Sequence, residues 1–267
     1  MKRDYIMIKK KCDKPNSLDY IEYIFTDFIE LAGDRISGED GALVGGIARI
    51  NNIPVTVLAQ IMGRNMEESI KANFSMMRPA GYRKVIRHLK QAEKFKRPVV
   101  CFVDTIGADP GEEAEREGQA SAIASTIMEM LTIRVPIFSI LIGNGFSGGA
   151  LALCVSNKIA MLESAHFGII SPKGGANILW KDSSRYEEAA KKLRMSAKDL
   201  MRCHIIDRII KERELKITAN SIKQYIVSQI CHYKSFSKEK IIDARRKKFI
   251  KLGSEYLYNI NQWDLEG

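Results

Sequence analysis

The sequence predicts an α/β fold in which parallel strands alternate with helices, extended by a helical segment at each end. Two strongly apolar runs, residues 98–103 and 135–142, are each followed by a glycine-rich segment and then by helical periodicity. Alternation of this kind indicates parallel strands joined by right-handed crossovers. From residue 183 onward the chain is highly charged and its apolar residues recur at helical spacing, which predicts helices rather than further strands.

The same observations divide the chain into three parts. We expect an N-terminal helical segment over residues 1–40, an α/β core over 41–210 and a C-terminal helical extension over 211–267. A length of 267 residues suits one large domain with such appendages. The sequence contains no internal repeat or low-complexity tract that would favour a further division.

The first elements follow from spacing and turn chemistry. A helix is predicted over Asn16–Gly33, because its apolar residues recur at helical spacing and either of its first two residues can cap it. Residues 45–50 and 54–61 alternate around Asn51-Asn52, a good turn for a two-residue hairpin. The later helices are expected at 79–95, 113–132, 147–154, 185–193, 196–203, 218–233 and 237–258, and the later strands at 98–103, 135–142, 158–162 and 166–170.

Apolar runs and cysteine spacing indicate where the chain works and which kinds of site it lacks. No apolar run is long enough for a membrane span, and residues 1–10 lack the apolar centre of a signal peptide, so we expect a cytoplasmic chain without a membrane partner. The cysteines show no Cys-x-x-Cys spacing, so we expect neither disulfides nor a metal site. They are Cys12, Cys101, Cys154, Cys203 and Cys231.

The formal net charge of +10 requires an explanation in terms of partners or solvent. Candidate partners are nucleic acid, an acidic protein subunit or a phosphate-rich substrate such as coenzyme A. Much of the excess lies in residues 238–248 and near the N-terminus, where a solvated helix face explains it equally well. The aromatic-basic interleaving typical of nucleic-acid readers is missing, so we expect no nucleic-acid partner.

The segment Gly143–Ala150 carries the strongest functional signal. After the apolar run it predicts a tight glycine turn and then the first turn of a helix, where backbone N–H groups lack intrahelical acceptors and the helix dipole favours negative charge. The segment Asp104–Gly111 follows the strand at 98–103 in the same way and predicts a second glycine turn before a helix. Two amide-rich turns after neighbouring strands predict a site that stabilises an oxyanion by backbone geometry.

Several motifs, in order along most of the chain, carry a family resemblance. They are Leu18–Glu22, Phe28–Arg35, Val44–Arg49, Gly63–Asn65, Pro79–Lys84, Asp104–Ala108, Gly118-Gln119, Ser147–Ala152, Ile178–Lys181 and the tail Arg245–Gly253. With these motifs the chain resembles the α subunits of bacterial acetyl-coenzyme A carboxylase carboxyltransferases, within the crotonase-like superfamily. Each motif alone is weak, but this many in order are specific.

The resemblance implies a crotonase-type ββα spiral for the core and a role in fatty acid biosynthesis, within a complex that also binds ATP. The implied reaction transfers a carboxyl group from carboxybiotin, held on a separate biotin carboxyl carrier protein, to acetyl-coenzyme A and yields malonyl-coenzyme A. It also implies a carboxyltransferase β subunit that carries a zinc ribbon and the acyl-coenzyme A side of a composite site, in an α2β2 assembly.

This chemistry explains why no His or Asp triad is evident. By resemblance, release of carbon dioxide leaves a biotin enolate that takes the methyl proton itself, so the protein supplies oxyanion donors rather than a base. Gly148 and Gly149 would be the catalytic residues, because their amides would hold the biotin oxyanion. The implied substrate-binding residues are Gly107, Ala108, Gly145, Ser147, Ala150, Gly174 and Gly175.

Each assignment has a structural alternative. The catalytic glycine pair could instead permit close packing of a helix on a strand. We expect Asp104 to cap the backbone that follows it, and His166 to be a core or interface residue. Gly174 and Gly175 could line the pocket or only form a turn.

The chain also departs from the family pattern. The family has lysine, proline, an aromatic residue, glutamate and glutamate where this chain has Met62, Ile106, Asp109, Asn144 and Lys173, and a Gly-Gly-Ala-His-Arg segment is missing near 211–217. The replacement of two glutamates by Asn144 and Lys173 raises the charge near the expected pocket, and the catalytic glycine pair is untouched. These departures favour a specialised second copy with a dedicated partner, of undetermined acyl specificity.

Two other functions remain open from the sequence. A stand-alone crotonase-like hydratase or isomerase would need a placed carboxylate in this chain, and its candidates are Glu112, Glu113, Glu115 and Glu117. A catalytically silent scaffold subunit would bind a partner without turnover. Activity of the isolated chain would indicate the first, and a stable but inactive complex would indicate the second.

Overall fold

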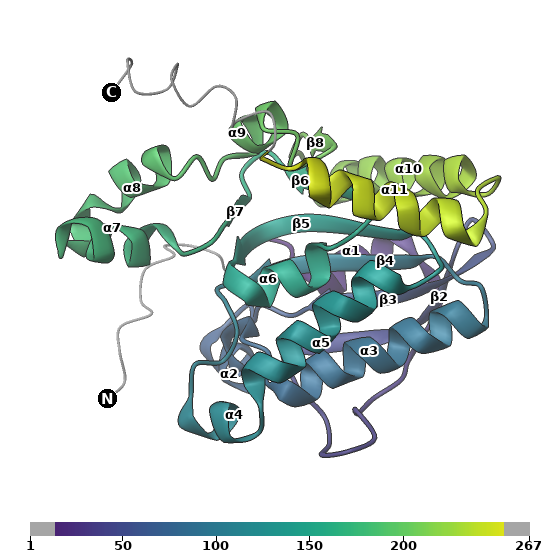
Figure 1. The fold of residues 1–267 in the computed structure, drawn as a ribbon, viewed down its shortest axis with the longest axis horizontal. Coiled ribbons are helices and arrows are strands. Elements are labelled where there is room, and N and C mark those ends of the chain that lie inside the picture. Colours follow the sequence, from purple (N-terminus) through teal and green to yellow (C-terminus); the bar gives the residue numbers. More distant parts are fainter. Residues whose placement is uncertain (1–13, 254–267) are drawn as a thin grey trace.

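One mixed sheet organises the computed structural model, which describes residues 14–253 (Figure 1). Its strand order is β1-β2-β3-β4-β5-β6-β8, and β7 pairs with the end of β5. The strands are β1 Thr26–Glu30, β2 Leu43–Ile50, β3 Ile53–Gln60, β4 Val99–Thr105, β5 Ile137–Phe146, β6 Lys158–Leu162, β7 His166–Gly168 and β8 Arg208–Ile210. The α-helices are α1 Ser17–Ile24, α2 Met66–Lys71, α3 Pro79–Lys94, α4 Glu112–Arg116, α5 Gln119–Thr132, α6 Ser147–Cys154, α7 Pro172–Trp180, α8 Tyr186–Lys192, α9 Ala197–Arg202, α10 Leu215–Tyr233 and α11 Lys238–Lys251, with short 3₁₀ turns at η1 Asn73–Ser75 and η2 Ser183–Arg185.

The strand directions confirm the predicted α/β class. Strands β1, β2 and β3 pair antiparallel, whereas β3, β4, β5, β6 and β8 pair parallel. The β2–β3 hairpin turns at Asn51 and Asn52, as predicted, and both residues have the positive φ that such a turn requires. Parallel strands buried on both faces are apolar throughout, which explains the unbroken runs in β4 and β5.

Helices cover both faces of the parallel strands. On one face, Phe102 of β4 stacks on Tyr20 of α1, and Phe138 of β5 packs against Tyr233 of α10. On the other, the Ser139 hydroxyl donates to the carbonyl of Leu153 in α6 at 2.5 Å. Helices α3, α5 and α6 lie together on this second face (Figure 1). The first turn of α6 is therefore held against the ends of β4 and β5.

The helix predicted over residues 16–33 is wrong beyond Ile24. Phe25 is extended, and β1 pairs antiparallel with β2, from Thr26 opposite Arg49 to Glu30 opposite Gly46. The helical spacing of residues 25–33 did not decide their structure. Pairing with the edge of β2 gives their backbone groups hydrogen bonds, so a longer helix would have gained none in addition.

Three other expectations need correction. The helix predicted over 113–132 is two helices, because Gly118 has a left-handed φ of 85° and ends α4 before α5 begins. Residues 143–146, predicted as a tight glycine turn, continue β5 as strand. Helix α7 occupies the segment around Gly174 that was considered as a turn, since Ser171 caps it and Pro172 is its first residue. The short elements α2 and β8 were not predicted.

The C-terminal helices pack on the rest of the domain. Helix α10 contacts α1 and β8, and α11 contacts α5. Within residues 14–253 no helix combines the length and apolar character that a membrane span requires.

Candidate active site

The chain turns from strand to helix at Ser147, an exposed residue with a φ of 61°. A left-handed conformation at a serine is strained, and strain of this kind concentrates at functional turns. The helix α6 begins at once, without a side chain capping its first turn. We predicted a turn made by glycine, but the residue at the bend is a serine. The spacing Gly145-x-Ser147-x-Gly149, which is typical of a sharp strand-to-helix turn at its serine, was the signal in the sequence that could have indicated this.

Gly148 and Gly149 are the second and third residues of α6, where N–H groups have no acceptor inside the helix. Within residues 14–253 neither amide has another hydrogen-bond acceptor. Gly148 is half-buried and Gly149 is buried. The start of α6 thus offers two unpaired donors at the positive end of the helix dipole.

The second glycine segment packs directly on the first. A Cβ on Gly149 would lie 2.6 Å from the amide nitrogen of Ala108 and 2.6 Å from the carbonyl carbon of Gly107, so only glycine allows this approach. Gly107 has a φ of 142°, and its N–H donates to the Thr105 hydroxyl at 3.1 Å. Open space surrounds the position where a Gly107 side chain would lie. The structure therefore joins the two amide-rich segments at the ends of β4 and β5.

We call the turn from β5 into α6, residues 145–150, the elbow. The other predicted residues divide between this elbow and a separate arm. Gly145 and Ala150 are buried in the elbow, and Gly145 lies against Phe167 of β7. Gly174 and Gly175 lie in the first turn of α7 and pack against side chains of residues 170, 171, 189 and 193. Gly175 allows α7 and α8 to pack closely, in the α7–α8 arm (residues 172–192) that extends beyond β7 (Figure 1), whereas Gly174 makes room only for the residues just before α7.

Asp104 at the end of β4 acts across the strands, whereas we expected it to cap the backbone after it. Its carboxylate is buried and accepts the backbone N–H of Asn144 at 2.8 Å. A Cβ on Gly143 would lie 2.3 Å from that carboxylate. Gly143 therefore makes room for Asp104, whose carboxylate holds the last residues of β5 before the elbow.

The remaining candidate groups have unremarkable surroundings for catalysis. The four glutamates at 112, 113, 115 and 117 are exposed on or beside α4. His166 is half-buried on β7, and burial lowers its pKa. Cys101 and Cys154 are fully buried, and burial raises the pKa of the Cys154 thiol to about 12. In the part of the chain that the structure describes, no three His, Cys, Asp or Glu side chains are grouped to hold a metal; Cys12 lies outside that part.

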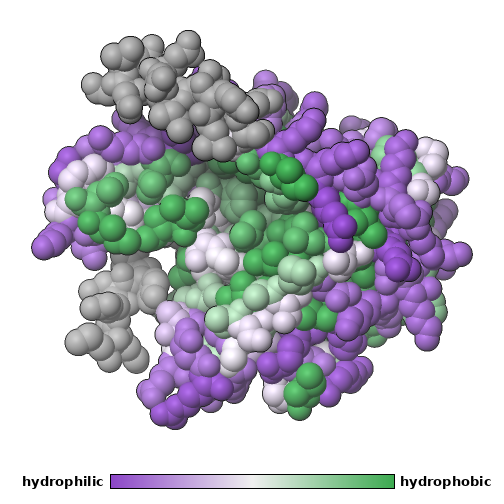
Figure 2. All heavy atoms as spheres, viewed as in Figure 1, coloured by the Kyte–Doolittle hydropathy of each residue, from purple (hydrophilic) through white to green (hydrophobic). Residues whose placement is uncertain are grey.

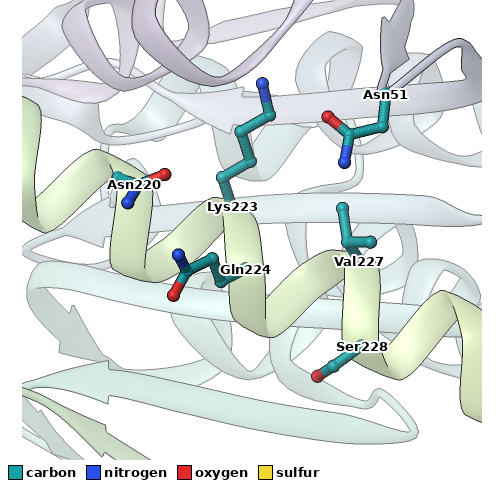
Figure 3. A pocket seen from close by; sticks show the side chains of 6 residues that line it. All are labelled: Asn51, Asn220, Lys223, Gln224, Val227 and Ser228. Atoms are coloured by element: carbon teal, nitrogen blue, oxygen red, sulfur yellow. The ribbon is translucent and has the colours of Figure 1, made fainter.

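A hollow of about 470 Å³ lies elsewhere, between the β2–β3 turn and α10 (Figure 3). It is lined by Asn51, Asn220, Lys223, Gln224, Val227 and Ser228. Its polar groups are amides, a hydroxyl and one ammonium, without a nucleophile paired to a base. Its composition does not match the oxyanion chemistry of the elbow.

Apolar side chains gather around the elbow on the molecular surface. Figure 2 shows a hydrophobic area across the middle of this face, surrounded by hydrophilic residues. Leu151 of α6 is partly exposed, and Ile169, Ile178 and Leu179 on and before α7 are 80%, 73% and 52% exposed. Extended exposed apolar areas with a polar rim mark interaction surfaces.

Comparison with known proteins assigns the family. The family model described as acetyl co-enzyme A carboxylase carboxyltransferase-like matches residues 2–253. The chain belongs to this family. A relative from Bacillus cytotoxicus, named acetyl-coenzyme A carboxylase carboxyl transferase subunit alpha, is 44% identical over 266 residues, covering 97% of this chain and 82% of the relative. A relative of the same name from Bacillus thuringiensis has the same identity and coverage.

Solved structures confirm the carboxyltransferase fold of this family. A Pseudomonas malonate decarboxylase hetero-tetramer in complex with coenzyme A has a chain with a TM-score of 0.70 at 16% identity, over 92% of this chain and 98% of that one. Transcarboxylase 12S, with methylmalonyl-coenzyme A bound, gives a TM-score of 0.68 at 19% identity, over 81% of this chain and 41% of that one. Both agree with the expected crotonase-like class.

Proposed function

We propose that this chain is the α subunit of a cytoplasmic, biotin-dependent carboxyltransferase that makes malonyl-coenzyme A from acetyl-coenzyme A. The two unpaired amides of Gly148 and Gly149 at the start of α6 carry the proposal. Membership of the family and the names of its 44% identical relatives support the reaction. The assembly would include a β subunit and a biotin carboxyl carrier protein.

The space beside the two glycine segments supports this role. The place of a Gly148 side chain is bordered only by Ile123, whose Cγ2 would lie 3.3 Å away, and the place of a Gly107 side chain is open. This space would let a ligand approach the backbone beside Gly148 and Gly107, whereas the side-chain position of Gly149 is filled by the neighbouring backbone. When bound, carboxybiotin would supply both the transferred carboxyl group and the base that accepts the methyl proton.

The residues of this chain would contribute orientation and electrostatic stabilisation. The amides of Gly148 and Gly149 would donate to the ureido oxygen as negative charge develops on it, and the dipole of α6 would add to their effect. Because amides do not titrate, these donors act at any pH at which the chain is folded. Ser147, Ala108 and the buried Ala150 would shape the cradle around them.

The apolar area around the elbow supports a composite site. A partner that covers the apolar area from Leu151 of α6 to Ile178 and Leu179 of the α7–α8 arm would also exclude water from the amides at the start of α6, which would strengthen their electrostatic effect. We assign the core that carries this site to residues 41–210, flanked by the segments 1–40 and 211–267. The β subunit would provide the opposite wall and the acyl-coenzyme A side.

The reverse reaction tests the proposal. Decarboxylation of malonyl-coenzyme A with a biotin derivative as acceptor would be measured with the purified chain, and then with the β subunit of the same genome. We expect turnover only with both chains. In the complex, Gly148→Val should lower kcat by about 100-fold or more, whereas the exposed Ala120→Val should not change it. Turnover by this chain alone would contradict the composite site, and a stable but inactive complex would indicate a silent subunit or another acyl substrate.

A further inference from the structure

Two buried glutamines connect the segments that carry the candidate donors. Gln60 ends β3 and is 0% exposed, and Gln119 begins α5 and is 3% exposed. The Gln60 side-chain amide donates to the carbonyl of Gly149 at 3.0 Å. The Gln119 side-chain amide donates to the carbonyls of Met77 and Asp109, at 2.8 and 2.9 Å. One glutamine thus holds the start of α6 and the other holds the loop after β4.

Met77 links the two glutamines. Its Sδ lies 3.4 Å from Nε2 of Gln60, and its carbonyl accepts from Gln119 and from the backbone N–H of Asp109, the latter at 3.1 Å. The loop after β4 in turn packs on Gly149. The contacts therefore form a closed ring that runs from Gly149 through Gln60, Met77 and Gln119 to the loop and back.

Two glutamines in this ring make the core less stable than apolar side chains of the same size would. The Oε1 atoms of Gln60 and Gln119 are both buried, and neither has a hydrogen-bond partner within residues 14–253. A buried acceptor without a partner destabilises the fold, and a methionine of similar volume would avoid that cost. The surrounding residues form the main apolar core. Stability alone does not explain why two amides are placed here.

We propose that Gln60 and Gln119 are positioning residues that aim the oxyanion donors of the carboxyltransferase site. By holding the Gly149 carbonyl, Gln60 sets the orientation of the first turn of α6, and Gln119 sets the loop on which that turn packs. Donors fixed before the reaction cost no reorganisation as charge develops, and small errors in their aim are costly. This inference rests on the proposed function, since it concerns the same site.

The test compares catalysis with stability in the assembled complex of both subunits. Gln60→Met keeps the volume and removes the donor. We expect kcat for malonyl-coenzyme A decarboxylation with biotin to fall by about tenfold or more, with KM changed by less than about threefold. The Tm should stay equal or rise. Gln119→Met should behave alike. Val57→Ala is the control, because it leaves a cavity beside the same strand without touching the ring. It should lower Tm and leave kcat unchanged.

Gln60→Glu gives a readout that a merely structural role would not produce. A protonated carboxyl group can still donate to the Gly149 carbonyl, whereas a carboxylate cannot. The Gln60→Glu complex should therefore be active at low pH and lose kcat as pH rises through the pKa of the buried carboxyl, while Gln60→Met should show no added pH step. Tm would be measured at the same pH values to show that the loss is not unfolding.

The outcomes separate this inference from the function itself. An inactive wild-type complex would contradict the proposed function. An active wild-type complex with unchanged kcat in Gln60→Met and Gln119→Met would overturn the positioning role alone. The positioning role would also be overturned if the Gln→Met variants lost kcat only in proportion to their loss of Tm, as any destabilised variant does, and if kcat of Gln60→Glu showed no pH step.

Discussion

At the scale of single residues, neighbouring glycines at the elbow serve different purposes. Gly149 is required by close packing, because its Cα lies against the backbone of Gly107 and Ala108. Gly148 faces only the side chain of Ile123. Gly143 makes room for the buried Asp104. The sequence pattern treats these glycines alike, whereas their contacts show that only some are needed for the fold.

Alanine substitutions should separate these roles. Gly149→Ala places a methyl group against backbone atoms that cannot move cheaply, so the free energy of unfolding should fall by about 1–3 kcal/mol. Gly148→Ala meets only a side chain at 3.3 Å and gains helix propensity, so stability should stay equal or rise by up to about 1 kcal/mol. Urea unfolding of both variants measures the difference. Equal losses would contradict the assigned contacts.

At the scale of elements, a buried arginine attaches the last helix to the core. Arg245 of α11 is fully buried, and its guanidinium donates to the carbonyls of Met130, Ile133 and Val135 at 2.6, 2.9 and 2.7 Å. It also donates to the side-chain oxygen of Asn157. The positive charge lies at the C-terminal end of α5, where the helix dipole is negative. Burial lowers the pKa of this guanidinium to about 10.

Removal of this guanidinium should release α11. Arg245→Met would leave three carbonyls, at the end of α5 and in the segment that follows it, without these donors. Each orphaned buried group costs about 1–3 kcal/mol, so a loss of at least about 3 kcal/mol is expected. Arg246→Met, on the exposed neighbour, should change stability by less than about 0.5 kcal/mol. Thermal unfolding of both variants tests this. A similar small shift for both would show that α11 is held by other contacts.

At the scale of the whole molecule, the positive charge is unevenly distributed. Residues 173–253 contain 21 Lys and Arg against 9 Asp and Glu, whereas residues 14–172 contain 16 against 18. Exposed basic residues on α11, such as Lys238 and Lys247, contribute to the excess, as a solvated helix face would. An acidic partner would be attracted to the C-terminal third of the chain, which also bears the α7–α8 arm.

Global stability should depend on pH through a buried histidine. His88 of α3 is fully buried, its Nδ1 lies 2.8 Å from the carbonyl of Lys84, and burial, aided by the charges of Lys84 and Arg87, lowers its pKa to about 4. Between pH 6.5 and pH 4 the unfolded chain binds a proton that the folded chain does not. Stability should therefore fall by about 3 kcal/mol as the pH decreases through this window.

Replacement of this histidine provides the control. His88→Gln should show a shallower loss of unfolding free energy between pH 6.5 and pH 4, measured by urea denaturation at each pH. The half-buried His166, whose pKa burial also lowers, should account for part of the remaining slope. Parallel curves for the wild type and the variant would show that His88 is not the group responsible.

Local signals in the sequence were sufficient to predict many of the secondary-structure elements of this protein. The turn at Asn51-Asn52, the amphipathic α3, the apolar β4 and β5 and the start of α6 at Ser147 all followed from spacing and residue type. Their signals are local, because period, caps and turn residues act within a few positions. Together they predicted the α/β class, and the motif order predicted the family.

Tertiary structure decided the rest. Residues 26–30 became strand because the edge of β2 was available, and residues 143–146 became strand because β4 and β7 pair alongside them. The contact of Gly149 with Gly107, and the glutamines that hold the two segments, join residues tens of positions apart. Such pairings leave no local periodicity in the sequence, since their free energy is gained only when the whole sheet brings the segments together.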